Sequence, residues 1–418
     1  MRSFWTGAAA AALLTGGTPA RADTVADWWD YAGKIASPLT AAAQTPDQQR
    51  AVTRASLAMF ESVNAIDRRY ESWLGFPAGD PGASQEAAAA TAAFKVLLAA
   101  FPAMKTALEE SYAITMDEVP EGPAKEKGRE IGEAAAKAAL AVGGADPAVK
   151  QTPYRPRAAP GEWVPTALPA IDTAMYAMKP WAIPSVEALM PPPPAALASP
   201  RWAASYEEVR RLGGRASKER TPHQTLMARY RQAFDLTPTM RSLADQPGRT
   251  PVQNARMFAR YQMAFDDSAE VMVAAKFKYD FWRPITAIRN GAADGNEATQ
   301  PDPAWAPLLP TPNFAEYPCG HCTVAAAIAE IMKAETGPRP PGGVRVGSLA
   351  VPNSIVQTLP SWDDWAQQVS DSRIYGGVHF RFSNEAGEQI GRAAARIVAD
   401  KVMRPIAAKP PERTRKRR

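Results

Sequence analysis

The chain has 418 residues, of which 46% are hydrophobic and 22% charged, and its formal net charge is +5. This balance excludes collagen, coiled-coil and wholly disordered chains, and it suits one large or two medium-sized domains. The charge excess lies in the last ten residues, which carry six basic side chains and one acidic side chain. The rest of the chain is close to neutral, so the charge gives little support for a nucleic-acid partner.

The first 22 residues have the features of an export signal. Arg2 supplies a basic start, an apolar run covers residues 7–14, and Ala20-Arg21-Ala22 forms a small-residue cleavage site. We predict cleavage before Asp23 and a mature protein in the periplasm or outside the cell, where disulfides can form. No other stretch has the roughly 20 uninterrupted apolar residues of a spanning helix, so no transmembrane segment is expected.

Apolar residues that recur every three or four positions predict a mostly helical chain. The helices expected in the first third are 48–68, 84–101 and 123–142. Those expected later are 200–212, 222–233, 251–281, 323–335 and 384–402, with loops rich in glycine and proline between the last two. Between them, the proline-rich stretch that includes Pro191-Pro192-Pro193-Pro194 predicts irregular chain.

We therefore predict an all-α fold, a helical bundle with long loops rich in proline and glycine. The expected organisation is a signal peptide at 1–22, an N-terminal helical region at 23–150, a proline-rich irregular wrapping segment at 151–200, a C-terminal helical catalytic region at 201–408 and a basic disordered tail at 409–418. A short basic terminus without apolar residues is typical of a solvated end of the chain.

Three segments in the C-terminal half combine residues suited to anion chemistry. In the first, Lys276 and Arg283 lie seven residues apart, about two helical turns, so both side chains are expected on one helix face. In the second, the run YPCGHC at 317–322 leads directly into a helix, whose first backbone N–H groups would face an anion. In the third, a Gly-Gly bend joins Arg373 to His379.

The chain has only three histidines, and two of them, His321 and His379, lie in these segments. The third, His223, belongs to no motif, and we assign it no role. The three cations together with a helix N-terminus suit a tetrahedral oxyanion, and the two imidazoles can act as acid–base, nucleophile or metal ligand. Taken singly, each segment also fits a structural role, such as a solvated basic face or a histidine that caps a helix.

In order and spacing the three segments resemble the signature of the vanadium-dependent haloperoxidases and type 2 phosphatidic acid phosphatases. That signature is Lys, six residues, Arg-Pro; then Pro-Ser-Gly-His; then Ser-Arg, five residues, His, three residues, Asp. The chain matches it at Lys276 to Arg283-Pro284, at Pro318-Cys319-Gly320-His321, and at Ser372-Arg373 to His379. The resemblance covers about residues 265–402 and favours the soluble bacterial haloperoxidase-like branch.

The resemblance implies an oxyanion site for vanadate or phosphate whose binding residues are Lys276, Arg283, Cys319, Gly320 and Arg373. It also implies that His379 is the axial vanadium ligand, or the nucleophile toward phosphorus, and that His321 is the acid–base group. Lys276 would polarise bound peroxide, and Phe314 would line a halide pocket. The implied cofactor is vanadate, or none if the protein is a phosphatase.

We accordingly predict a vanadate-dependent haloperoxidase-like enzyme that oxidises halide with hydrogen peroxide. Val273 stands where the fungal chloroperoxidases carry Trp, which favours bromide over chloride. The alternative is a soluble, metal-independent acid phosphatase that forms a phosphohistidine in the same pocket. A second alternative is a degenerate oxyanion-binding protein without activity. In each case the expected partners are small molecules.

Two positions depart from the signature, because Cys319 replaces its serine and Ser383 replaces its aspartate. A thiol is a weaker donor to an oxyanion, and Ser383 is expected to be the N-cap of the last helix. The sequence offers three other carboxylates that could orient His379: Asp267, Asp280 and Glu385.

Cys319 and Cys322 also form a C-x-x-C motif at a helix start, as in thiol–disulfide oxidoreductases. That function needs a thioredoxin βαβ unit, which the sequence does not predict. We therefore advance the hypothesis of a structural or regulatory disulfide between the two cysteines, because an oxidising compartment is expected.

Overall fold

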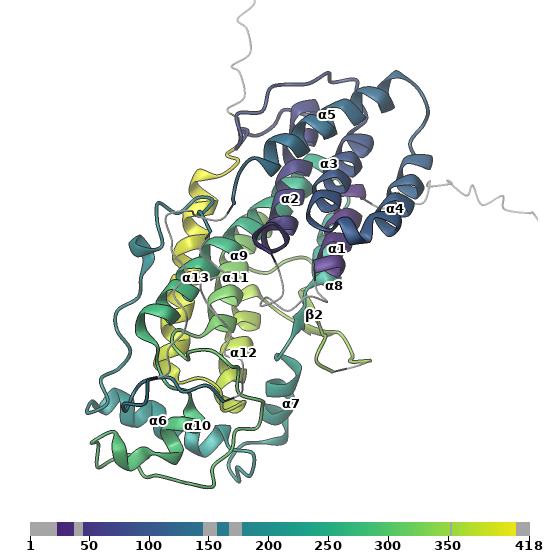
Figure 1. Cartoon of the computed structure of the whole chain (residues 1–418). Coiled ribbons are helices and arrows are strands. Elements are labelled where there is room, and N and C mark those ends of the chain that lie inside the picture. Colours follow the sequence, from purple (N-terminus) through teal and green to yellow (C-terminus); the bar gives the residue numbers. More distant parts are fainter. Residues whose placement is uncertain (1–22, 37–44, 145–156, 167–177, 352, 407–418) are drawn as a thin grey trace, which may run out of the picture.

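The computed structural model describes residues 23–36, 45–144, 157–166, 178–351 and 353–406. The predicted signal peptide at 1–22 and the predicted tail at 409–418 lie outside these residues. The described chain is mostly helical with one small sheet, as Figure 1 shows, so the all-α prediction is confirmed. Among the described residues no single helix is long and apolar enough to span a membrane; a strongly bent pair, 85–100 with 102–117, passes by length and composition.

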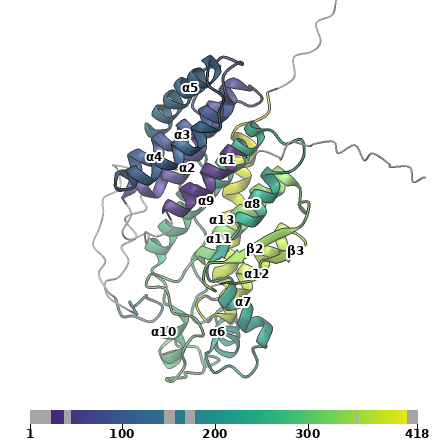
Figure 2. The ribbon, with the colours of Figure 1, turned by 90° about the vertical axis from the view of Figure 1, so that its right-hand side faces the viewer.

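The N-terminal helices gather at one end of the molecule (Figure 2). They are α1 (Thr24–Ala36), α2 (Pro46–Ile66), α3 (Gln85–Ala100), α4 (Lys105–Asp117) and α5 (Pro123–Leu140), with a 3₁₀ turn, η2 (Pro102–Met104), before α4. Thr45 and Gln48 form a capping box at α2, and Ser84 caps α3. Because α3 is rich in alanine, its neighbours can approach its backbone closely, and 11 of its 16 residues are buried.

The C-terminal part contains the longest helix and most of the loops. Its elements are α6 (Pro200–Gly213), α7 (Pro222–Tyr230), β1 (Phe234–Asp235), α8 (Thr237–Ala244), α9 (Pro251–Tyr279), α10 (Pro284–Arg289), η5 (Gly291–Ala293), α11 (Gly320–Thr336), β2 (Val344–Ser348), β3 (Gln357–Leu359), α12 (Trp362–Tyr375) and α13 (Arg381–Lys401). Helices α9, α11 and α13 pack against one another. One buried apolar cluster runs from α1, α2 and α3 through α9 to α11 and α12.

The sheet has three short antiparallel strands in the order β1-β2-β3. Phe234 lies opposite Ser348, and Val344 lies opposite Leu359. The sequence does not predict these strands, and two of them have only two or three residues. Strands this short contain too few alternations to give a periodic signal.

The described parts of the predicted wrapping segment, 157–166 and 178–199, are irregular apart from one 3₁₀ turn, η4 (Glu187–Leu189). The segment is fixed to α9 by Asp267, whose carboxylate accepts the backbone N–H groups of three successive residues, Trp181, Ala182 and Ile183, at 2.6, 2.8 and 3.0 Å. It is also fixed to the site region, because the Tyr317 hydroxyl donates to the Pro192 carbonyl at 2.7 Å.

Helix α12 corrects the expectation of loop between the last two predicted helices. Ser361 caps it by accepting the Asp364 N–H. Its buried residues Trp362, Trp365, Ala366 and Val369 have the three- and four-residue spacing of an amphipathic helix. The periodic signal was therefore present, although the surrounding glycines and prolines obscured it. Helices α1, α4, α8 and α10 were also not predicted.

Helices α11 and α13 approach each other closely because glycine replaces side chains at their contact. A Cβ at Gly387 would lie 2.5 Å from the Cys319 carbonyl oxygen, and a Cβ at Gly391 would overlap the Thr323 carbonyl oxygen. Cys319 and Thr323 belong to the first turn of α11. The close contact therefore fixes where the N-terminus of α11 lies.

Candidate oxyanion site

Lys276 lies in the last turn of α9 and is 2% exposed. Its Nζ donates to the carbonyl oxygens of Ala315, Glu316 and Pro318 at 3.0, 2.7 and 2.5 Å. An ammonium group has three N–H donors, so all of them are used by the loop before α11. Burial lowers the pKa of Lys276 well below its ordinary value, and Arg283 adds to this effect.

Arg283 reaches the same place by a turn and not along a helix face, which corrects the prediction from its spacing. Helix α9 ends at Tyr279, Asp280 adopts a left-handed conformation with φ 44°, and Arg283 is the N-cap of α10. Phe281 pairs with Glu162 of the wrapping segment, which holds this turn. A seven-residue spacing fits two helical turns, but the same spacing also spans a helix end.

The guanidinium of Arg283 is fully buried. Its Nε donates to the Phe314 carbonyl at 2.8 Å, and its Nη1 donates to the Val378 carbonyl at 2.9 Å and lies 3.2 Å from His379 Nε2. Burial lowers the pKa of Arg283 to about 9, although Glu316 opposes the shift. The ring of Phe314 lies 4.8 Å from the Arg283 guanidinium and 5.3 Å from Lys276 Nζ.

The N-terminus of α11 contributes backbone donors. Cys319 is its N-cap and Gly320 its first residue. Among the described residues, the N–H groups of Gly320 and His321 have no hydrogen-bond partner. These two groups are therefore available to an anion at the positive end of the helix.

Cys319 and Cys322 form a disulfide. Cys319 Sγ accepts the N–H of Cys322 at 3.2 Å and so caps the helix. A sulphur atom in a disulfide carries no proton, so Cys319 cannot donate to an oxyanion as the predicted thiol would. This corrects its predicted binding role, and the backbone is the donor that this segment retains.

His321 Nε2 lies 2.9 Å from the carbonyl oxygen of Gln232. A carbonyl only accepts, so Nε2 carries the proton and Nδ1 is left with its lone pair. Burial lowers the pKa of His321 to about 3, with Arg373, Arg283 and Lys276 contributing. The second residue of α11 is thus close to all three cations.

Arg373 lies in the last turn of α12 and is 2% exposed. Among the described residues its Nε and Nη1 have no hydrogen-bond partner, and the same holds for Nη2 of Arg283. Burial lowers the pKa of Arg373 to about 10. Buried guanidinium N–H groups in native proteins are nearly always paired, so this arrangement indicates a place for an anion.

The Gly-Gly bend returns the chain from α12 to the site as predicted from its composition. Gly377 has φ 74°, a conformation that glycine adopts without strain. His379 follows and is 2% exposed. Its Nδ1 lies 2.7 Å from Glu316 Oε1, which also accepts the backbone N–H of Phe380 at 3.0 Å.

Glu316 is the functional residue that the sequence analysis missed, and it is fully buried. Burial raises its pKa to about 7, while Arg283 and Lys276 lower it. Burial also lowers the pKa of His379 well below its ordinary value, and the neighbouring cations add to that shift. An acidic residue in an apolar, proline-rich loop directly before the second motif was the available signal.

None of the three carboxylates suggested by the sequence contacts His379. Asp267 binds the wrapping segment, Asp280 pairs with Arg157 at 3.1 Å, and Glu385 pairs with Arg201 at 2.6 Å. Ser383 is also not an N-cap, because α13 begins at Arg381 and Ser383 is its third residue. Its buried side chain helps to lower the pKa of Glu316 instead.

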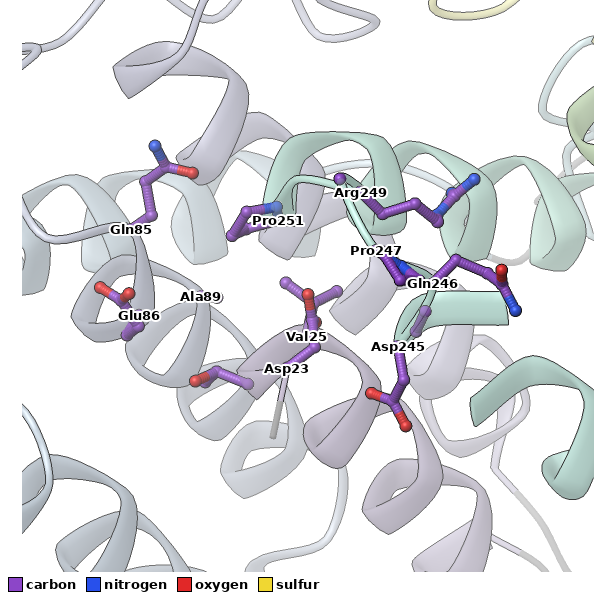
Figure 3. A pocket seen from close by; sticks show the side chains of 13 residues that line it. Asp23, Val25, Gln85, Glu86, Ala89, Asp245, Gln246, Pro247, Arg249 and Pro251 are labelled. Atoms are coloured by element: carbon purple, nitrogen blue, oxygen red, sulfur yellow. The ribbon is translucent and has the colours of Figure 1, made fainter. Parts of the chain in front are cut away.

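Two other features lie apart from the site. His223 is an exposed residue in the first turn of α7. A pocket of about 320 Å³ lies between the start of α1, α3 and the turn from α8 to α9 (Figure 3). Asp23, Glu86 and Asp245 line it, and none of its lining residues belongs to the oxyanion site.

Comparisons with known proteins found a sequence match for part of the chain and a similar fold for most of it. Residues 256–408 match the family model described as the VCPO second helical-bundle domain. This region is therefore similar in sequence to the vanadium chloroperoxidases. The match contains all three motifs, together with Glu316 and the disulfide.

A vanadium chloroperoxidase from Curvularia inaequalis is 30% identical over 89 residues, which are 19% of this chain and 14% of that protein. The chain thus aligns with only about a seventh of the length of this haloperoxidase.

Solved haloperoxidase structures share the fold more widely. The first bacterial vanadium-dependent iodoperoxidase has a TM-score of 0.73 at 19% identity and covers 93% of this chain and 97% of its own. An apo bacterial vanadium-dependent chloroperoxidase has a TM-score of 0.64 at 15% identity, with coverages of 85% and 93%. Its holo counterpart gives 0.63 at 18%, with coverages of 84% and 90%. The haloperoxidase fold therefore includes the N-terminal helices.

Proposed function

We propose that the protein is a vanadate-dependent haloperoxidase-like enzyme. The observation that carries the proposal is the set of unpaired, buried N–H groups on Arg283 and Arg373, together with a histidine that offers a lone pair beside them. These donors fit the oxygen atoms of a tetrahedral oxyanion, and an imidazole nitrogen fits a metal. The residues present therefore suit vanadate.

In this proposal, Arg283, Arg373 and the first N–H groups of α11 hold the oxygen atoms of vanadate, and His379 Nε2 is its protein ligand. When bound, vanadate would activate hydrogen peroxide for the oxidation of a halide. Lys276 contributes its positive charge and holds the loop before α11. Because loop carbonyls occupy its three N–H groups, it can contact an oxyanion or polarise peroxide only by exchanging one of these bonds.

His321 is the proposed acid–base group. Its lowered pKa keeps the imidazole neutral at ordinary pH, so Nδ1 can accept a proton from peroxide. A bound anion would offset the three cations and raise this pKa, which makes the imidazole a stronger base when the site is loaded. The hydrogen bond from Nε2 to Gln232 leaves Nδ1 as the nitrogen that accepts the proton.

The proposed substrates are hydrogen peroxide and a halide, with bromide favoured over chloride because of Val273. The half-buried ring of Phe314 lies beside two cations and is the proposed wall of the halide pocket. Iodide is included because one structure of the same fold is an iodoperoxidase. The disulfide supports an oxidising location, so we propose that the protein is exported to the periplasm or beyond.

One observation favours acid phosphatase activity as the second candidate. The pairing of Glu316 with His379 supplies the carboxylate that a nucleophilic histidine needs, although Ser383 replaces the aspartate of the signature. In that reaction His379 would attack phosphorus, and His321 would protonate the leaving alcohol. The degenerate, binding-only protein is the third candidate.

A paired assay tests these proposals. Halogenation of a dione dye with vanadate and peroxide is measured with bromide, iodide and chloride, and hydrolysis of an aryl phosphate is measured without metal. Both are repeated with His379→Ala, which should abolish the true activity. Protection by vanadate against heat without either activity would favour the binding-only protein. Absence of protection by both vanadate and phosphate would contradict the site itself.

A further inference from the structure

Glu316 makes hydrogen bonds through both its side chain and its backbone, and one of them joins it to His379. Among the described residues it is the only carboxylate that hydrogen-bonds to a member of the site. Its Oε1 accepts the backbone N–H of Phe380 at 3.0 Å and lies 2.7 Å from Nδ1 of His379. Its own backbone N–H donates to the Phe281 carbonyl at 2.8 Å, and its carbonyl accepts from Lys276. The residue is thus held by main-chain contacts on both sides.

These contacts select one tautomer of His379. An oxygen that already accepts the Phe380 N–H is an acceptor toward Nδ1 as well, so Nδ1 carries the ring proton. On the other side of the ring, Arg283 Nη1 is a donor 3.2 Å from Nε2, which therefore presents its lone pair. Two separate partners, an acceptor and a donor, impose the same result. Nε2 is the nitrogen that a ligand of the cation cluster would meet.

Glu316 is also the carboxylate of the cation cluster. Three basic side chains, Lys276, Arg283 and Arg373, and one carboxylate, Glu316, are buried there. Among the described residues of the site, basic groups therefore outnumber carboxylates. A tetrahedral oxyanion such as phosphate or vanadate complements this excess of basic groups.

We propose that Glu316 is a positioning residue that presents Nε2 of His379 as an electron-pair donor to a tetrahedral oxyanion held by the cation cluster. The proposal rests on the proposed function, because it concerns the same site. The proposal predicts that Glu316 affects the binding of vanadate and of phosphate differently. Vanadate bonds to an imidazole nitrogen and gains from a carboxylate on the far side of the ring. Inorganic phosphate binds at equilibrium through hydrogen bonds and charge alone.

The test is the ratio of the dissociation constants for orthovanadate and inorganic phosphate in Glu316→Gln, each measured by calorimetry on the full chain. The amide keeps an acceptor for Nδ1 but removes the charge. We expect phosphate to bind at least as tightly as in the wild type, because a negative charge is lost from the site. Vanadate should lose about 10- to 100-fold relative to phosphate, the usual cost of removing an outer partner of a metal ligand.

Glu385→Gln is the control, since Glu385 pairs with Arg201 on the surface of α13 and makes no contact with the site. It should leave both constants unchanged. An equal loss of vanadate and phosphate affinity in Glu316→Gln would show a merely structural role and overturn the proposal. An unchanged ratio would overturn it as well.

A second measurement needs no Glu316 variant. The ¹⁵N resonances of ring-labelled histidine distinguish a protonated from an unprotonated ring nitrogen, and His379→Gln assigns the signal among three histidines. We expect Nδ1 protonated and Nε2 unprotonated in the wild type, and the opposite tautomer would overturn the proposal. If the wild type binds neither anion, the proposed function fails, while the tautomer still decides the role of Glu316.

Discussion

At the scale of single residues, Arg373 shows how the site trades stability for binding. Its guanidinium is buried without a carboxylate and leaves two N–H groups unpaired among the described residues. A buried charge without a partner costs free energy of folding. Such a group is useful where a bound anion pairs with its N–H groups. Its removal should therefore stabilise the anion-free protein and weaken anion binding.

We expect Arg373→Met to leave the free energy of unfolding of the anion-free protein unchanged or to raise it by about 1–3 kcal/mol. The same variant should bind phosphate and vanadate at least about tenfold more weakly, because charge-assisted hydrogen bonds contribute roughly 1.5–3 kcal/mol each. Urea unfolding with and without anion measures both effects. Arg381→Met is the control, since Arg381 pairs with Glu208 and Asp371. That variant should lose stability and keep anion binding, and the same pattern in Arg373→Met would contradict the prediction.

His321 predicts a pH dependence. Its pKa is about 3 in the folded protein and about 6.5 in the unfolded chain, because burial and the cations disfavour its charged form. Between these values the unfolded chain binds the additional proton, so stability is lost as the pH falls from about 6.5 toward 3. We expect this group to contribute a slope of at most about 1.4 kcal/mol per pH unit. His321→Gln should remove that part of the slope in urea unfolding at pH 7 to 4, whereas a parallel slope in the two proteins would contradict it.

The cations and histidines of the site could be predicted because they resemble a family signature, whereas the helical spacing of Lys276 and Arg283 gave the wrong local geometry. The place of Glu316 in an apolar loop was a signal, but its role could not be predicted, because its contact with His379 joins residues 63 positions apart. Cys319 illustrates a different difficulty. Its position was predicted, but its chemistry depends on whether Cys322 closes a disulfide, which the spacing alone does not decide.

At the scale of elements, the contact between α11 and α13 determines where the oxyanion donors lie. A methyl group at Gly391 would meet the Thr323 carbonyl in the first turn of α11. We expect Gly391→Ala to cost about 1–3 kcal/mol of stability through overpacking and to weaken phosphate binding by moving the α11 N-terminus.

Gly33→Ala in α1 is the matched control, because nothing lies within 4 Å of a Cβ there. The same substitution should raise stability by up to about 1 kcal/mol through helix propensity. Thermal unfolding and phosphate calorimetry compare the two variants. A Gly391→Ala protein as stable as the wild type would show that the two helices do not determine each other's position.

The long helices were predictable because their apolar periodicity persists for several turns. Helix α9 was expected at 251–281 and is found at Pro251–Tyr279. The difference of two residues is important, because the left-handed Asp280 and the turn after it bring Arg283 to the site. Helix ends depend on tertiary contacts, here the pairing of Phe281 with Glu162, and such contacts leave no periodic trace.

At the scale of the whole molecule, the N-terminal helices and the site share one apolar core and one helix. Arg50 of α2 pairs with Asp266 and Glu270 of α9 at 2.9 Å each, and Lys276 lies further along the same helix. Between them, Asp267 holds the wrapping segment. The described parts of the chain are therefore expected to unfold together.

We expect Asp267→Asn to lower the free energy of unfolding by about 1–3 kcal/mol. The carboxylate has two charged oxygens that accept three backbone N–H groups, and the amide has only one, uncharged oxygen. The loss should appear in a single transition followed by both tryptophan fluorescence and circular dichroism. Asp363→Asn, which alters a half-exposed carboxylate that pairs with Lys333 and Arg392, should change stability by less than about 1 kcal/mol. Separate transitions from the two probes would show that the wrapping segment and the bundle unfold independently.

Lys276 joins the end of α9 to the loop that forms the anion pocket. Three carbonyl oxygens of the loop before α11 surround its ammonium group, which is attached to the last turn of the long helix α9. The folded shape of the loop before α11 therefore depends on a charge that the end of α9 supplies. A residue that neither touches the anion nor lies in the loop can thus determine the form of the pocket, if it moves the end of α9.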